Sequence, residues 1–194
     1  MSPRRWALAA LVSAAAVTGL ALVQCSRTAA GEPAGDCACA GTPIVDGTLL
    51  AFLSKARAAH HSADLREEDG DLDLAVAALE PVVAPPRPAA PEALEVVADT
   101  YARLADLKSD LGDLDSALRD VDAGLAIAAR PTHFRGHLLE IEGVVLERRY
   151  HALDAMGETE AAARIKAQAL EAFKSAIDVQ DQVIDDALGD AGPR

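Results

Sequence analysis

The sequence predicts an all-α protein in which antiparallel helix pairs stack into a short solenoid behind an N-terminal apolar segment. Beyond Thr42, alanine and leucine dominate, and apolar residues return every three or four positions, which is the period of an amphipathic helix. The alternation of β-branched and polar residues that marks a strand is absent there. One glycine-acid turn recurs three times, at Gly70, Gly112 and Gly157. These observations favour repeated helix pairs over a fold that contains a sheet.

The first 24 residues are expected to be a signal peptide or a membrane anchor. Arg4 and Arg5 precede a run of 18 residues, Trp6–Val23, that no charge interrupts. This run is long for a cleaved signal core and close to the roughly 20 residues that span a bilayer. The arginines keep the N-terminus in the cytoplasm, so the remainder is expected outside the inner membrane. We therefore expect a bacterial cell-envelope protein on the periplasmic side.

Cys25 bears on how the chain is held there. The segment Leu22-Val23-Gln24-Cys25 resembles the bacterial lipobox, in which Cys25 would carry the lipid, although Gln24 stands where that motif has a small residue. Three outcomes stay open: a lipoprotein, an uncleaved single-span anchor, and a released protein cleaved after Ala30. The first two would both tether the chain to the membrane.

Residues 25–47 are rich in glycine, alanine and proline and are expected to form a flexible tether. The tether contains Cys37 and Cys39, and an oxidising compartment allows a disulfide between them. A bridge across one residue closes a small, strained ring, and such bridges tend to be labile. Two alternatives stay open, a passive disulfide and a redox or soft-metal site. Two thiolates alone do not complete a zinc site.

Residues 48–188 carry six helix patterns in three pairs. The pairs cover about 48–84, 92–130 and 132–188, and residues 189–194 form a polar tail. Thr48, Asp113 and Thr132 are the expected N-caps, because their side-chain oxygens can accept from the free N–H groups of a first turn. Pro81 is expected to kink or end the second helix, and the proline-rich segment 85–91 is expected to be extended.

The last helix is the longest and carries an apolar stripe on one face. The stripe consists of Ala162, Ile165, Ala169, Phe173, Ile177, Ile184 and Leu188. Each pair is joined by the recurring turn, in which glycine adopts the left-handed conformation that ends one helix and the next acidic residue caps the following helix. An alanine five residues after each glycine allows close helix packing.

Between Tyr101 and Pro131, large, leucine and small residues stand at regular positions of one helix pair. They are Tyr101, Leu104, Ala105, Gly112, Leu114, Ala117, Gly124 and Leu125. In this pattern the segment resembles the tetratricopeptide repeat family. The flanking units match less well, and the turn glycines are 42 and 45 residues apart where the family repeats every 34. The resemblance implies a divergent repeat of about three helix pairs, roughly the minimum that buries a shared core.

The resemblance also implies a binding surface, because that family binds partners along the concave face formed by the first helix of each pair. The carried-over positions are Asp64, Glu67, Asp99, Asp106, Asp110, Glu147, His151 and Asp154, together with Arg57, His60, Glu68 and Ser109. An acidic groove would attract a basic peptide, with affinity falling as salt rises. The chain holds 31 acidic and 18 basic residues, a net charge of −13, so a merely solvated acidic face stays open as the alternative.

Composition and motifs disfavour several other classes of function. Nucleic-acid binding needs clustered lysine and arginine with stacking aromatics, and the only tryptophan, Trp6, lies in the anchor. No glycine-rich phosphate loop or nucleophile turn occurs, so neither an enzyme nor a bound cofactor is expected. His133 and His137 share a helix face, but only Glu140 could join them, and no metal site is expected there.

These observations favour a membrane-tethered scaffold or adaptor of the cell envelope that binds a protein or peptide through its helix pairs. The alternative is an envelope metal or redox accessory protein that uses Cys37, Cys39 and the histidines. A third hypothesis is a subunit whose long last helix docks into a larger complex. The sequence does not fix the oligomeric state.

Overall fold

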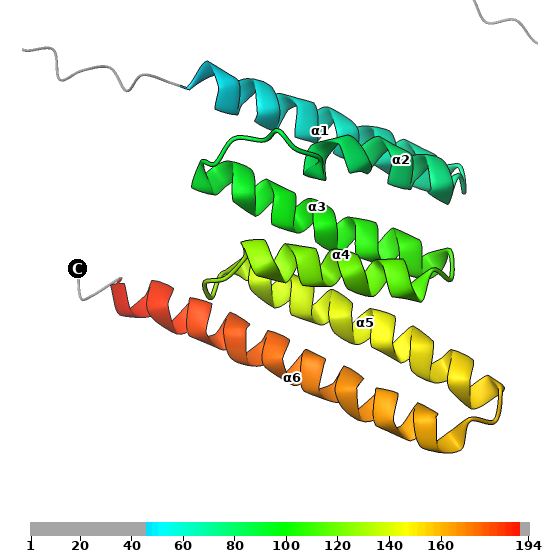
Figure 1. The fold of residues 1–194 in the computed structure, drawn as a ribbon. Coiled ribbons are helices and arrows are strands. Elements are labelled where there is room, and N and C mark those ends of the chain that lie inside the picture. Colours follow the sequence, from blue (N-terminus) through cyan, green and yellow to red (C-terminus); the bar gives the residue numbers. More distant parts are fainter. Residues whose placement is uncertain (1–45, 191–194) are drawn as a thin grey trace, which may run out of the picture. The chain divides into compact units, whose positions relative to one another are not determined.

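Six α-helices, joined in antiparallel pairs, make up residues 46–190, the part of the chain that this computed structural model describes (Figure 1). They are α1 (Gly47–Glu68), α2 (Leu72–Val83), α3 (Pro91–Asp110), α4 (Leu114–Ile127), α5 (His133–Ala155) and α6 (Thr159–Asp190). The expected all-α class is confirmed for these residues, which contain no strand. The anchor at 1–24 and the sites at Cys25, Cys37 and Cys39 lie outside the described residues.

The three turns have the geometry that their glycines predict. Gly70, Gly112 and Gly157 have φ angles of 81°, 84° and 79°, which side chains with a Cβ rarely adopt. The alanines that follow are buried, with exposed fractions of 0% at Ala75, 0% at Ala117 and 2% at Ala162. Each turn therefore reverses the chain tightly and lets the two helices of a pair approach closely.

Side-chain capping agrees with the sequence at Asp113 and Thr132 and differs at α1 and α2. Asp71, the expected cap of α2, stands at its N-cap position, but its side chain accepts no hydrogen bond from the first turn. Asp113 accepts a hydrogen bond from the backbone N–H of Ser116, and Thr132 accepts one from Arg135. At α1 the cap is Asp46 and not Thr48, because the Asp46 carboxylate accepts from the N–H groups of Thr48 and Leu49 at 2.8 and 3.3 Å. A carboxylate placed just before Gly47 lets the helix begin two residues earlier than a cap at Thr48 would.

Two helix ends differ from the expected ones. Helix α4 ends at Ile127, three residues before Arg130, and the Arg135 guanidinium donates to the Ala128 carbonyl at 2.9 Å. Pro131 disfavours a helical conformation of the residue before it, so the side chain of Arg135 satisfies a carbonyl that further helix would have used. Helix α6 continues through Gly189 to Asp190, beyond the expected start of the polar tail.

The proline-rich connection does not separate the first helix pair from the others. Helix α2 passes through Pro81 and ends two residues later, while the Lys55 ammonium donates to the Pro81 carbonyl at 2.9 Å. Leu79 of α2 packs in one cluster with Leu104 and Leu107 of α3. The three pairs therefore share a continuous set of contacts, and α3 lies against α1, α2, α4 and α5.

The core is built from small residues on facing helices. Its central cluster joins α3, α4 and α5 through Ala98, Ala102, Ala105, Ala117, Val121, Leu138, Ile141 and Val145. Gly124 allows α4 to approach α5, because a Cβ there would lie 2.5 Å from Leu138 Cδ2. Gly143 does the same between α5 and α6, where a Cβ would lie 2.6 Å from the Phe173 ring. The helices therefore pack mainly by close approach of their backbones over small residues rather than through large side chains.

The predicted apolar stripe of α6 is only partly buried. Ala162 and Ala169 are buried, whereas Ile177, Ile184 and Leu188 have exposed fractions of 60%, 52% and 69%. The second half of the stripe faces solvent because no helix of the described chain follows α6 to cover it. Within residues 46–190, no helix is both long enough and apolar enough to cross a membrane.

Candidate functional site

The side of the molecule formed by α1, α3 and α5 carries charged residues at helical spacing. On α3, Asp99, Arg103, Asp106 and Asp110 follow one another at steps of four, three and four residues, which places them on one face. His60, Asp64 and Glu67 stand at the same steps on α1, and Glu147, His151 and Asp154 on α5. We call this surface the groove face.

A depression in the groove face holds about 280 Å³ between the three helices. It is lined by His60, Glu67, Asp99, Ala102, Arg103, Asp106, Leu107, His137 and Ile141. We call it the groove. Drug-sized ligands occupy cavities of about 300–1,000 Å³ that are mostly apolar, so this groove suits a single polar side chain better than such a ligand.

Arg103 ties α3 to α1 across the groove. Its guanidinium lies 2.6 Å from an Asp64 carboxylate oxygen and 2.8 Å from a Glu67 carboxylate oxygen. The three side chains are 29%, 42% and 46% exposed, so solvent screens the pairs and each contributes only about 0.2–1 kcal/mol. Two of the predicted groove carboxylates therefore already share the single positive charge of one arginine.

Arg148 makes the same kind of tie from α5 to α3. It lies 2.8 Å from an Asp106 carboxylate oxygen and 2.6 Å from an Asp110 carboxylate oxygen, and it also contacts the hydroxyl of Ser109. Ser109 was expected at the groove surface, but it is 4% exposed and donates to the Asp106 carbonyl at 2.7 Å. It lies beneath Arg148 and is not available to a partner.

His137 and Asp99 form a third link between α5 and α3. Their nearest side-chain atoms are 3.5 Å apart. The hydrogen bond from His137 lowers the pKa of Asp99 even though partial burial opposes this shift, and the bond to Asp99 raises the pKa of His137. Both shifts favour the charged pair, an imidazolium beside a carboxylate.

His60 behaves in the opposite way on α1. Its Nε2 lies 2.9 Å from the Thr100 hydroxyl oxygen, and that hydroxyl donates to the Val96 carbonyl at 2.7 Å. Because the single hydroxyl hydrogen is used there, Nε2 must be the donor to Thr100. Burial lowers the pKa of His60, so this histidine stays neutral near pH 7 and satisfies the buried Thr100.

The remaining predicted residues lie further along α5. Glu147 and His151 are exposed and 3.8 Å apart, and Asp154 is exposed one turn later. They share the groove face with the α3 carboxylates but do not line the groove itself. Of the eight predicted positions, Glu67, Asp99 and Asp106 line the groove, and Asp64 and Asp110 pair with the arginines beside it.

Sequence reasoning missed the two arginines that organise this face. Arg103 stands four residues after Asp99 and three before Asp106, so helical spacing alone places it among the α3 carboxylates. Arg148 directly follows Glu147, so it does not share the helical spacing of the predicted α5 positions with that residue, and helical spacing gave no comparable indication. The acidic excess on the groove face therefore comes with bound counter-charges and is smaller than the sequence suggested.

This arrangement can exchange ion pairs with an incoming cation. Each arginine sits between two carboxylates, which is the geometry in which an incoming guanidinium or ammonium would also be held. Within residues 46–190 no group of three or more His, Cys, Asp or Glu side chains is arranged to hold a metal ion. The rings of His133 and His137 are stacked with 6.3 Å between their centroids, and His137 is paired with Asp99.

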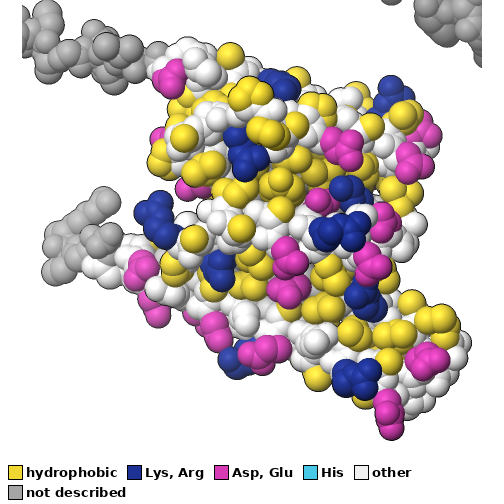
Figure 2. Space-filling model, in the orientation of Figure 1, with side chains coloured by type: hydrophobic (Ala, Val, Ile, Leu, Met, Phe, Trp, Pro, Cys, Tyr) yellow, Lys and Arg dark blue, Asp and Glu magenta, His cyan; other side chains and the backbone are white. Residues whose placement is uncertain are grey.

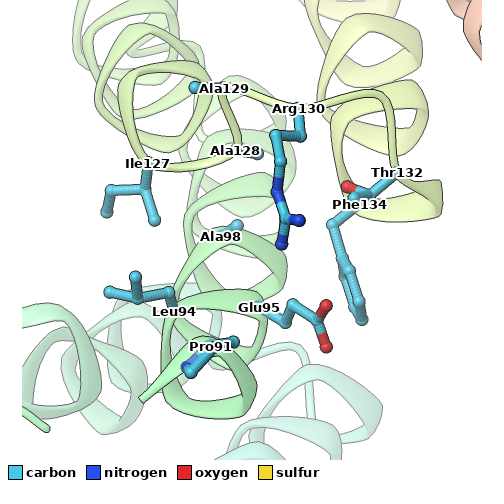
Figure 3. A pocket seen from close by; sticks show the side chains of 10 residues that line it. All are labelled: Pro91, Leu94, Glu95, Ala98, Ile127, Ala128, Ala129, Arg130, Thr132 and Phe134. Carbon is cyan, nitrogen blue, oxygen red and sulfur yellow. The ribbon is translucent and has the colours of Figure 1, made fainter. Parts of the chain in front are cut away.

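A second pocket of about 200 Å³ opens where α3 begins, α4 ends and α5 begins. Figure 3 shows Leu94 and Ile127 on one side, Phe134 on the other, and the side chains of Arg130 and Glu95 between them. The start of α3 is distant in sequence from the connection between α4 and α5 that completes the pocket, so no local sequence pattern predicts it. Its mostly apolar lining suits a small hydrophobic side chain.

Charges elsewhere on the surface are mixed. On the face drawn in Figure 2, Lys and Arg side chains lie among Asp and Glu side chains, with hydrophobic patches between them. The carboxylates on that face therefore resemble an ordinary solvated surface, which makes the ordered pairs of the groove face the more specific feature.

Comparisons with known proteins add no relative to this description. No protein-family model matches the chain, and neither a curated protein nor a solved structure does. The resemblance to tetratricopeptide repeats therefore stays a prediction.

Proposed function

We propose that this chain is a protein-binding scaffold of the bacterial cell envelope, tethered to a membrane by its N-terminal segment, and that its groove binds a basic peptide of a partner protein. The helix pairs are proposed to be divergent tetratricopeptide repeats, in keeping with their tight turns. The observation that carries the proposal is the row of carboxylates on α1, α3 and α5 around one depression, with guanidinium groups already seated between them.

Binding would proceed by exchange of partners within these ion pairs. A lysine or arginine of the peptide enters the groove beside Glu67, Asp99 and Asp106, and the exposed Glu147 and Asp154 attract the basic residues that follow. Each exposed ion pair contributes only about 0.2–1 kcal/mol, so replacing it by an ion pair with the peptide costs little free energy. Tight binding therefore needs several such contacts at once. The chain's net charge of −13 speeds the encounter with a basic partner at low salt.

The experiment measures binding of a fluorescent Arg/Lys-rich peptide to the detergent-solubilised full chain by anisotropy, at low and high salt. We expect the D99N/D106N/D110N variant to bind about tenfold more weakly, and wild-type affinity to fall as salt rises. A matched control, D69N/D73N/E80Q, removes the same charge away from the groove face and should bind as the wild type does.

A second variant separates binding from stability, because Asp99 and Asp106 also tie helices together. E147Q/D154N leaves the ties to Arg103, Arg148 and His137 intact and should still weaken binding several-fold. Equal binding by all variants at all salt concentrations would reject the groove as the site and leave its carboxylates as a solvated face.

The tether is a separate part of the proposal and rests on the sequence of residues 1–24. Radiolabelled palmitate should enter the chain through Cys25, and C25A should abolish that labelling. If no label enters and the chain still sediments with membranes, the uncleaved span is the tether; a chain found only in the soluble fraction would reject tethering.

A further inference from the structure

Four of the nine large hydrophobic side chains that are exposed in the described residues lie on one helix, α6. Leu170, Ile177, Ile184 and Leu188 have exposed fractions of 62%, 60%, 52% and 69%. Their spacing of seven, seven and four residues keeps them on one side of the helix over five turns. Scattered exposed leucines are common, but a continuous row at heptad spacing marks an interaction surface.

The repeat itself shows that the first residue of this row occupies a position that is covered in the other two pairs. The residue thirteen positions after each turn glycine is Val83 in the first pair, Leu125 in the second and Leu170 in the third. Val83 packs against the cluster that includes Leu104 of α3, and Leu125 packs against the cluster that includes Leu138 of α5. Leu170 occupies the same place in its pair and faces solvent.

Beside this row lies a depression that could receive a side chain from outside. It holds about 380 Å³ between α5 and α6, and Gly136, Phe173 and Ile177 contribute to its wall. Gly136 keeps the two helices close, since a Cβ there would lie 2.5 Å from the Gln180 amide nitrogen. The row and the depression together form one surface, which we call the α6 flank.

Charges along α6 are divided about Ile177. Its basic residues, Arg164, Lys166 and Lys174, all precede Ile177, accompanied by two glutamates, whereas five aspartates follow it between Asp178 and Asp190. Close to the apolar row, Lys174 stands one turn before Ile177 and Asp181 one turn after it, and both are exposed. A helix that runs antiparallel to α6 with its own charges divided in the same way would therefore be complementary.

We propose that the α6 flank binds a second copy of this chain, with the two α6 helices antiparallel and related by a twofold axis near Ile177. In that register Leu170 faces Ile184 of the partner, because each lies seven residues from the axis. Lys174 faces the segment around the partner's Asp181, and the symmetry creates this contact twice. A parallel pair would set the aspartate-rich halves against each other.

This contact adds to the groove without using it. The Lys174 ammonium already lies 2.9 Å from Asp178 on its own helix, but both side chains are more than 60% exposed, so the exchange to a partner's aspartate costs little. The groove residues lie on α1, α3 and α5, so a dimer through α6 would carry two grooves on one assembly. Two linked sites raise avidity for a partner with repeated basic segments.

The test is sedimentation equilibrium of the full chain in density-matched detergent, with single charge reversals. We expect a wild-type dimer, and K174E and D181K should each weaken self-association about tenfold, because attraction becomes repulsion at two places. An equimolar mixture of K174E and D181K should recover the wild-type affinity, because each variant then supplies the charge that the other needs. In a parallel pair like charges already face each other, so the single variants would associate no more weakly than the wild type and the mixture would associate more tightly than it.

Two further variants keep the test decisive. I177D places charge on the axis and should abolish dimerisation, while circular dichroism should show an intact fold since Ile177 is already 60% exposed. R164E reverses a charge on an exposed part of α6 away from the apolar row and should dimerise normally. A monomeric wild type, or association that I177D does not change, overturns the proposal. Failure of the mixture to recover overturns the antiparallel arrangement.

Discussion

The same repeat position is partly buried in the middle of the stack and exposed at its α6 end. Leu125 of α4 packs against the central cluster because α5 covers it, whereas Leu170 at the equivalent place on α6 is 62% exposed. Both are leucines at the same distance from a turn glycine, and both belong to amphipathic helices. The comparison shows that burial in a helical repeat is set by the following helix and is not written into the residue.

Truncation in the central cluster gives the largest expected effect. L138A removes a side chain with an exposed fraction of 0% that packs on Gly124, so we expect the free energy of unfolding to fall by about 3 kcal/mol. Urea unfolding followed by circular dichroism measures the change. L188A is the control at the exposed end and should lie within about 0.5 kcal/mol of wild type. Equal losses from both variants would contradict the contrast between middle and end.

Leu125 and Leu170 occupy equivalent repeat positions, so the same substitution at both gives a direct comparison. L125A should lower the free energy of unfolding by about 1–2 kcal/mol, because its side chain is partly buried against the cluster around Leu138. L170A should cost less than about 0.5 kcal/mol when urea unfolding is followed at protein concentrations low enough to keep the chain monomeric. A loss from L170A as large as that from L125A would mean that something covers the α6 flank in solution.

Removing an ion pair between helices is expected to lower stability by a smaller amount, and only in the middle of the stack. R148A removes the pairs with Asp106 and Asp110, and we expect a loss of about 1 kcal/mol that shrinks with added salt, because the arginine is 33% exposed. K174A removes the exposed pair with Asp178 on α6 and serves as the control, with little change expected. A double-mutant cycle with D110N should return a coupling energy near zero if Arg148 acts only through packing.

The smallest effect is a pH dependence of the link between α3 and α5. The pKa of His137 is raised by Asp99, so the stability that this histidine contributes is complete below about pH 6.5 and is lost as the pH rises through its folded pKa. The pKa of His60 is lowered by burial, so His60 destabilises the fold as the pH falls below about 6.5. NMR titration of the two imidazoles should find their pKa values on opposite sides of 6.5.

A matched pair of variants checks this dependence by unfolding. H137N should reduce the loss of stability that the wild type shows as the pH rises above 6.5. H60N should reduce the loss that the wild type shows as the pH falls below 6.5. His61, an exposed neighbour on α1, provides the control, since H61N should leave both arms of the profile in place. Identical profiles for all three variants would show that neither histidine couples to folding.

Much of the fold follows from local chemistry and was predictable. The glycine turns, the caps at Asp113 and Thr132 and the alternation of helices depend on residues within a few positions of one another. The expected cap at Thr48 was wrong for a local reason, since Asp46 caps α1 instead. Other predictions failed where a more distant group acted. Arg135 of α5 donates to the Ala128 carbonyl where α4 ends earlier than expected. The second half of the α6 stripe is exposed because no helix of the described residues covers it.

The sequence by itself determined that this chain forms helix pairs joined by tight turns, that its first residues form an apolar segment, and that acidic residues recur at helical spacing. Only the tertiary structure decided which carboxylates are paired, since Arg103 and Arg148 find their partners on other helices. It also decided which apolar residues are buried. The physical reason is the same in both cases: a helix fixes the direction of a side chain, and the neighbouring helix decides what that side chain meets.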